Sequence, residues 1–188
     1  MKDNETESDS RNSKEHSVRP IVESSDANMS ELVATAYHEA GHAVMALTLG
    51  RAIQKVTIAP GQMQTGGQRL GACEIKKGRL KPAQDGLEDD ILILFAGMVA
   101  ESRVTHRYCQ RGASLDLRAA RRLIATRANT QRQLEKLERR LLDKAEHLFA
   151  DAGHAKAIEL IALELMQKET ISGRAARHFF EQAIAQFS

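Results

Sequence analysis

The segment from Glu31 to Leu49 most restricts how this chain can fold. Most of its positions hold Ala, Val, Leu or Met, so a helix there would be apolar nearly all round. Such helices are usually buried inside a protein. Ser30 is a suitable N-cap, with Glu31 in the first turn, and Gly50 supplies a stop. We therefore predict a buried helix that begins near Ser30 and ends at Leu49.

Three ionisable side chains, those of His38, Glu39 and His42, lie in the middle of this apolar segment. Burying them without partners would cost several kcal/mol, so something must satisfy them. His38 and His42 are four residues apart and share one helix face, where both imidazoles can reach a single zinc ion. Glu39 points to one side, from where it can act on a metal-activated water without being a ligand. The pattern also arises by chance, chiefly in polar segments, but its apolar setting favours a His-Glu-x-x-His metallopeptidase site.

A catalytic zinc needs a third protein ligand and an open fourth position. Asp116 follows Ser114, which is a suitable cap for a helix reaching Ala125, and the helix dipole by itself explains an acidic residue in that first turn. Spacing does not choose among the downstream candidates, so the residues alone leave the third ligand open. These candidates are Glu74, Asp85, Glu88, Asp89, Asp90, Glu101, His106 and Asp116.

The rest of the chain is predicted to be mainly helical. Lys55–Ala59 and Leu70–Ile75 have the composition of strands and flank a turn rich in Gly and Gln. After Asp85 the apolar residues recur at helical spacing as far as Ile184, with Gly153 separating two of the helices. Aromatic residues make up 4% of the chain and Trp is absent, so aliphatic side chains and Ala must build the core. That composition favours helix packing over a sandwich or barrel.

Composition separates a polar tail from the rest of the chain. Residues 1–28 are rich in Ser, Glu, Asp and Asn without an apolar period, so we expect a disordered tail followed by one domain over residues 29–188. No stretch approaches the roughly 18–20 apolar residues of a membrane span, and the N-terminus lacks the apolar core of a secretory signal. Cys73 and Cys109 are too few for a disulfide scaffold. A cytoplasmic protein with reduced thiols is the expectation.

A run of basic residues lies between Leu117 and Leu142. Without residues 1–28 the chain holds 23 basic and 18 acidic residues. A solvated helix face is the usual meaning of such a run, and a docking surface for an acidic partner comes second. No aromatic residue interleaves it to stack bases, so nucleic acid is not expected. The basic residues are Arg118, Arg121, Arg122, Arg127, Arg132, Lys136, Arg139 and Arg140.

From Glu31 to Ile184 the chain resembles the peptidase domain of the FtsH-type ATP-dependent zinc proteases. The resemblance implies that Asp116, the aspartate of a Gly-Ala-x-x-Asp stretch, is the third zinc ligand. The phosphate-binding pattern Gly-x-x-x-x-Gly-Lys-Ser/Thr of that family does not occur in this chain, and neither does its membrane segment. The resemblance rests on residues 36–44, on residues 55–60 with 70–71, on residues 95–101 with 112–117, and on residues 165–173.

We therefore predict a mainly α (α+β) fold, a zincin-like helical domain with a small β-hairpin. Zn²⁺ would be bound by His38, His42 and Asp116, with Glu39 as the general acid and base. The expected activity is that of an endopeptidase for peptides or unfolded proteins, independent of ATP, with a separate ATPase or an acidic protein as further partners. The resemblance also offers the second strand, around Leu70 to Ala72, as an edge for an extended substrate.

The alternative is a metal-stabilised, non-catalytic adaptor that binds a partner through its basic helix face. Glu39 argues against this alternative, because a purely structural metal site does not require that carboxylate.

Overall fold

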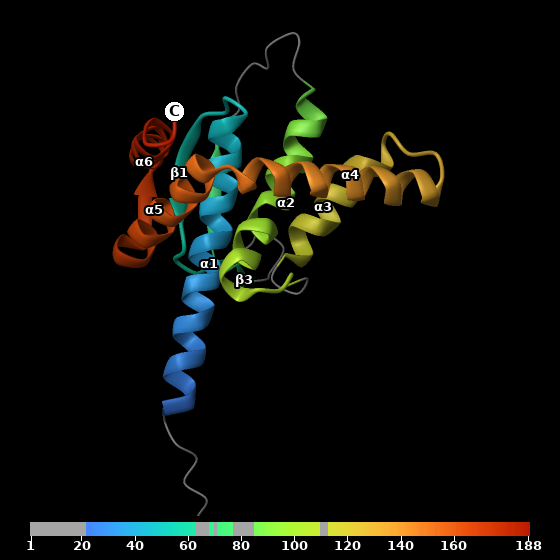
Figure 1. The fold of residues 1–188 in the computed structure, drawn as a ribbon. Coiled ribbons are helices and arrows are strands. Elements are labelled where there is room, and N and C mark those ends of the chain that lie inside the picture. The colour runs from blue at the N-terminus through green and yellow to red at the C-terminus, as the bar shows by residue number, and fades with distance from the viewer. Residues whose placement is uncertain (1–21, 63–67, 70, 77–84, 110–112) are drawn as a thin grey trace, which may run out of the picture.

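A computed structural model describes residues 22–62, 68–69, 71–76, 85–109 and 113–188 (Figure 1). Within these residues the chain forms six helices and a small antiparallel sheet that contacts α1, α5 and α6, which confirms the predicted mainly α fold. The helices are α1 (Val22–Thr48), α2 (Gly86–Thr105), α3 (Ser114–Ala125), α4 (Gln131–Ala150), α5 (Ala152–Lys168) and α6 (Gly173–Ala185).

The sheet has the strand order β4-β1-β5, so the first strand in sequence lies in the middle. β1 (Ile53–Thr57) pairs in antiparallel fashion with β4 (Ala72–Ile75) and β5 (Thr170–Ser172). The predicted strand pair is thus present, although β1 begins earlier than expected and Leu70 lies outside the described residues. A separate short ladder joins β2 (Gly61–Gln62) to β3 (Gln68–Arg69).

The sequence analysis missed β5. Three residues between two helices are too few to show strand periodicity. β5 is held in place by its pairing with β1, in which Val56 lies opposite Ile171. The hydroxyl groups of Thr57 and Thr170 also lie 2.6 Å apart across this pair.

α1 begins earlier than predicted. It starts at Val22 and continues through Ser30, which therefore is not its cap, and its N-terminal part extends beyond the rest of the fold (Figure 1). The sequence holds no Pro or Gly between Pro20 and Gly41, so nothing between them breaks the helix. Residues 22–28, which we assigned to the polar tail, thus belong to this helix, and the rest of the expected tail lies outside the described residues. Gly50 ends the helix as predicted, with a φ of 74° that suits glycine.

α1 and α2 cross at very close range, and this crossing positions the site. A Cβ added at Gly41 would lie 2.5 Å from the carbonyl oxygen of Ala96 and 2.6 Å from the Cβ of Ala100. Ala40 and Ala43, on either side, are fully buried. Small residues at the contact let the two backbones approach, so side chains on the middle of α1 reach those on α2.

Two predicted helix boundaries were wrong. Ser114 is the first residue of α3 rather than its cap, and Ala113 occupies the cap position without a side-chain hydrogen bond. Gly153 lies inside α5, where an added Cβ would come within 3.0 Å of Ile184 Cδ1 on α6. Asp151 is the actual boundary, because its carboxylate accepts a hydrogen bond from the His154 backbone and caps α5.

Candidate metal centre

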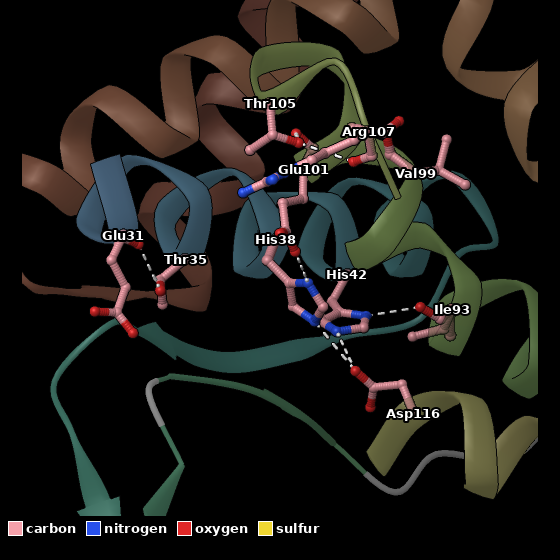
Figure 2. Close-up of polar contacts among 11 residues, drawn as sticks. Glu31, Thr35, His38, His42, Ile93, Val99, Glu101, Thr105, Arg107 and Asp116 are labelled. Atoms are coloured by element: carbon pink, nitrogen blue, oxygen red, sulfur yellow. Dashed lines mark hydrogen bonds and ion pairs between the residues drawn. The ribbon is translucent and has the colours of Figure 1, made fainter. Parts of the chain in front are cut away.

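The side chains of His38 and His42 project from consecutive turns of α1 toward the same point (Figure 2). Their ring centroids are 4.8 Å apart, with the ring planes nearly perpendicular. The two side chains are 12% and 10% exposed, so most of each ring is withdrawn from water. The predicted stacking of the two imidazoles on one helix face is present.

Each imidazole is oriented through its Nδ1 atom by a group on α2. Nδ1 of His38 lies 3.0 Å from Oε2 of Glu101, and Nδ1 of His42 donates to the carbonyl oxygen of Ile93 at 2.7 Å. A carbonyl oxygen can only accept, so His42 carries its proton on Nδ1 when neutral and keeps a lone pair on Nε2. Such partners are what orient histidine ligands in metal sites.

Asp116 completes the cluster from the first turn of α3. Its Oδ2 lies 3.1 Å from Nε2 of His38 and 3.4 Å from Nε2 of His42. The potential ligand atoms of these three residues all lie within 4.8 Å of one another. The fold therefore brings together the three residues that the sequence analysis selected as zinc ligands.

Charge couples the three residues tightly. Burial alone would lower the pKa of His38, but hydrogen bonds to Asp116 and Glu101 outweigh it and raise that pKa to about 10. Burial would likewise raise the pKa of Asp116, yet its hydrogen bonds to His38 and His42 hold it well below its usual range. Without a metal, a protonated His38 balances the negative charge of Asp116 and Glu101. A bound cation would take over that role.

The donors and the space around them suit a zinc ion. Two imidazole nitrogens and one carboxylate oxygen form a set that zinc commonly accepts, with a fourth position left for water or substrate. A Cβ added at Gly97 would lie 2.6 Å from Nε2 of both His38 and His42. The space in front of the two nitrogens is therefore open because α2 carries no side chain there.

Replacing Gly97 with Ala should weaken zinc binding by about 10- to 100-fold, the range seen when the surroundings of a metal site are disturbed. The added methyl group would occupy the position where the ion must sit. Competition with a chromophoric chelator measures the affinity. Gly153→Ala is the matched control, because its methyl group meets Ile184 away from the site. Equal affinities in wild type and Gly97→Ala would contradict this placement of the ion.

Glu39 lies beside the cluster rather than in it. The residue is 7% exposed, and a Cβ added at Gly71 would lie 2.6 Å from its Oε1. The backbone leading into β4 therefore approaches the carboxylate closely. Burial, followed by the charges of Glu39 and Glu74, raises the pKa of the nearby Cys73 thiol, which stays protonated.

The other candidates for the third ligand are engaged elsewhere or lie apart from the two Nε2 atoms. Glu101 faces Nδ1 of His38, on the far side of the ring, and so positions it. Among the described residues, only Asp116 groups with both histidines at ligand distances. Four further candidate carboxylates form ion pairs with basic side chains: Glu74 with Lys55, Asp85 with Arg127, Glu88 with Arg140 and Lys144, and Asp90 with Arg51.

Sequence reasoning did not assign the contributions of Ile93 and Gly97. Ile93 contributes its backbone carbonyl oxygen, which every residue has, so the residue type could not indicate this role. Gly97 lies within residues 95–101, one of the stretches that carried the resemblance, but its role depends on what faces it.

Comparison with known protein families gives one match. The model of "Peptidase family M41" matches residues 27–131, which include α1 from residue 27 onward, the sheet strands β1 and β4, α2 and α3. A search of curated proteins finds no match. None of the helices in the described part of the chain is both long and apolar enough to cross a membrane. The matched segment covers more than half of the chain and contains all the residues of the cluster. The chain therefore belongs to peptidase family M41, whose members are zinc-dependent metallopeptidases and include the FtsH protease domain.

Proposed function

We propose that this chain is a zinc endopeptidase of the His-Glu-x-x-His type. His38, His42 and Asp116 would hold the ion, and Glu39 would act as general base and acid. The observation that carries the proposal is the convergence of two Nε2 atoms and one carboxylate oxygen within 4.8 Å, beside a buried glutamate on the same helix.

Zinc bound at this site would supply a Lewis acid that activates water and polarises the scissile carbonyl group. Glu39 follows His38 directly on α1, and its carboxylate lies close enough for its charge to raise the pKa of His38. There it can take a proton from the attacking water and deliver it to the leaving amine. Glu101 and Ile93 keep the rings of His38 and His42 in the orientation that binding requires.

The sheet supports an extended substrate. Among the described strands β4 lies at the edge, in the order β4-β1-β5, and the backbone of Gly71, the residue before it, runs close to the Glu39 carboxylate. An edge strand offers unpaired backbone groups to which an extended peptide can add. A segment paired there would lie next to the proposed acid and base, whereas a folded chain would have to open first.

The adaptor alternative fits less well. Three of the basic residues on α3, α4 and the segment between them form ion pairs within the chain, namely Arg121 with Glu138, Arg127 with Asp85 and Arg140 with Glu88. They tie helices together and leave fewer charges for a partner. A buried carboxylate at position 39 costs stability and is useful chiefly to a catalyst.

We expect proteolysis by the purified, zinc-loaded protein to be independent of ATP and restricted to unfolded chains. The chain has no phosphate-binding loop, and folded substrates expose extended segments only through rare local opening. The measurement compares a denatured casein with a stable folded domain, each with and without ATP. Rapid cleavage of the folded domain, or acceleration by ATP, would refute this expectation. A chelator-treated sample serves as the control for metal dependence.

A further inference from the structure

One edge of the sheet leads directly to the candidate metal centre. β4 pairs with β1 along one side, and no described strand pairs with its other side. The backbone of Gly71, which leads into β4, runs so close to Glu39 that an added Cβ would lie 2.6 Å from its Oε1. An extended chain added to β4 would therefore place the residue opposite Gly71 beside the proposed acid and base.

The residues of β4 alternate between the two faces of the sheet. Cys73 faces the interior, since it lies opposite the fully buried Val56, and burial and then the charge of Glu39 raise the pKa of its thiol. Glu74 therefore lies on the other face, opposite Lys55 on β1. The side chains of Glu74 and Lys55 are 34% and 45% exposed, so this face is open to solvent.

Glu74 supplies a negative charge at this edge. Its Oε1 lies 3.2 Å from Nζ of Lys55 on the neighbouring strand. Adjacent strands lie about 4.8 Å apart, so a chain added to β4 would run one strand away from Glu74 and two strands, roughly 10 Å, from Lys55. Interactions between charges weaken with distance, so the nearer carboxylate would dominate over the more distant ammonium group.

We propose that Glu74 is a specificity-determining residue, and that the site favours extended segments with Lys or Arg three or four residues from the scissile bond. The inference rests on the proposed peptidase function. That bond would lie on one side of the substrate residue opposite Gly71, and Glu74 is three residues further along the strand. The substrate residue opposite Glu74 projects from the same face and can form a cross-strand ion pair, whereas its neighbours point to the other face.

The test measures binding separately from cleavage. Zinc-loaded Glu39→Gln protein is titrated into fluorescently labelled peptides of about twelve residues derived from one neutral parent, and anisotropy gives Kd. Each derivative carries a single Lys or a single Glu at one position, from the second to the fifth residue on either side of the central bond. Lys should bind about three- to tenfold more tightly than Glu at the third or fourth residue on one side, an advantage that falls as salt rises.

Matched variants assign this preference to a residue. Glu74→Gln should abolish the advantage of Lys over Glu, and Glu74→Lys should reverse it. Lys55→Gln should enlarge the advantage, because it removes the cation that competes for the carboxylate. Glu135→Gln, which alters an exposed carboxylate on α4, is the control and should leave the advantage unchanged. Circular dichroism checks that each variant retains the helical fold.

Equal Kd values for Lys and Glu at the third and fourth residues, the same advantage at every position, no binding of any peptide, or an advantage that survives Glu74→Gln would each overturn the inference. Cleavage by the protein with Glu39 intact is scored independently. Selective binding through Glu74 without any cleavage would contradict the proposed activity and leave the recognition standing. Cleavage without a preference for Lys would contradict the recognition alone.

Discussion

Replacing Glu39 with Gln should reduce peptide cleavage by about 10²–10⁴-fold while zinc content and fold stay unchanged. Gln keeps the size of the side chain but cannot take a proton from water. Glu39 is buried beside the ligands and lies outside the set of ligand atoms, so its loss should spare the metal. The measurements are kcat/KM on a fluorogenic peptide and zinc content by elemental analysis.

Glu31→Gln is the matched control for this variant, because Glu31 lies on the same helix two turns earlier and is exposed. Its activity should equal that of the wild type. Undiminished cleavage by Glu39→Gln would show that the base lies elsewhere. Loss of zinc together with activity would show that Glu39 is a ligand.

Removing a ligand should have the second large effect. We expect His38→Ala, His42→Ala and Asp116→Asn each to weaken zinc binding by more than about 100-fold, because even indirect supports of a metal site contribute 10–100-fold. Peptidase activity should disappear with the metal. Chelator competition and elemental analysis of the purified variants measure this loss.

Two further variants separate ligands from supports. Glu101→Gln should retain zinc with about 10- to 100-fold lower affinity, because Glu101 contacts only Nδ1 of His38. His147→Ala, an exposed position on α4, should bind zinc like the wild type. Should Glu101→Gln lose the metal while Asp116→Asn keeps it, the assignments of these two carboxylates would have to be exchanged.

The central part of the site could be predicted from the sequence because it is local. The spacing of His38 and His42 places both rings on one face of any helix, and the position of Glu39 follows from the same geometry. The apolar character of residues 31–49 likewise predicted burial, and the fully buried Ala40 and Ala43 confirm it. These properties depend only on residues within a few turns of one another.

The third member of the cluster could not be derived in this way. His38 and Asp116 are separated by 78 residues, and spacing left eight downstream candidates equal. Resemblance to a family singled out Asp116, and the packing of α3 against α2 brings it to both Nε2 atoms. The same packing assigns Glu101 to the opposite nitrogen of His38, a distinction that residue type alone cannot make.

Some features depend on which distant segment faces a residue, and only the tertiary structure could reveal these. β5 is a strand because β1 is there to pair with it, and Gly97 matters because two imidazoles face it. Helix periodicity acts over a few residues, so the sequence by itself determined the helix that carries His38, Glu39 and His42. Contacts between distant segments are set by how the whole core packs, and they decided which side chains complete the site.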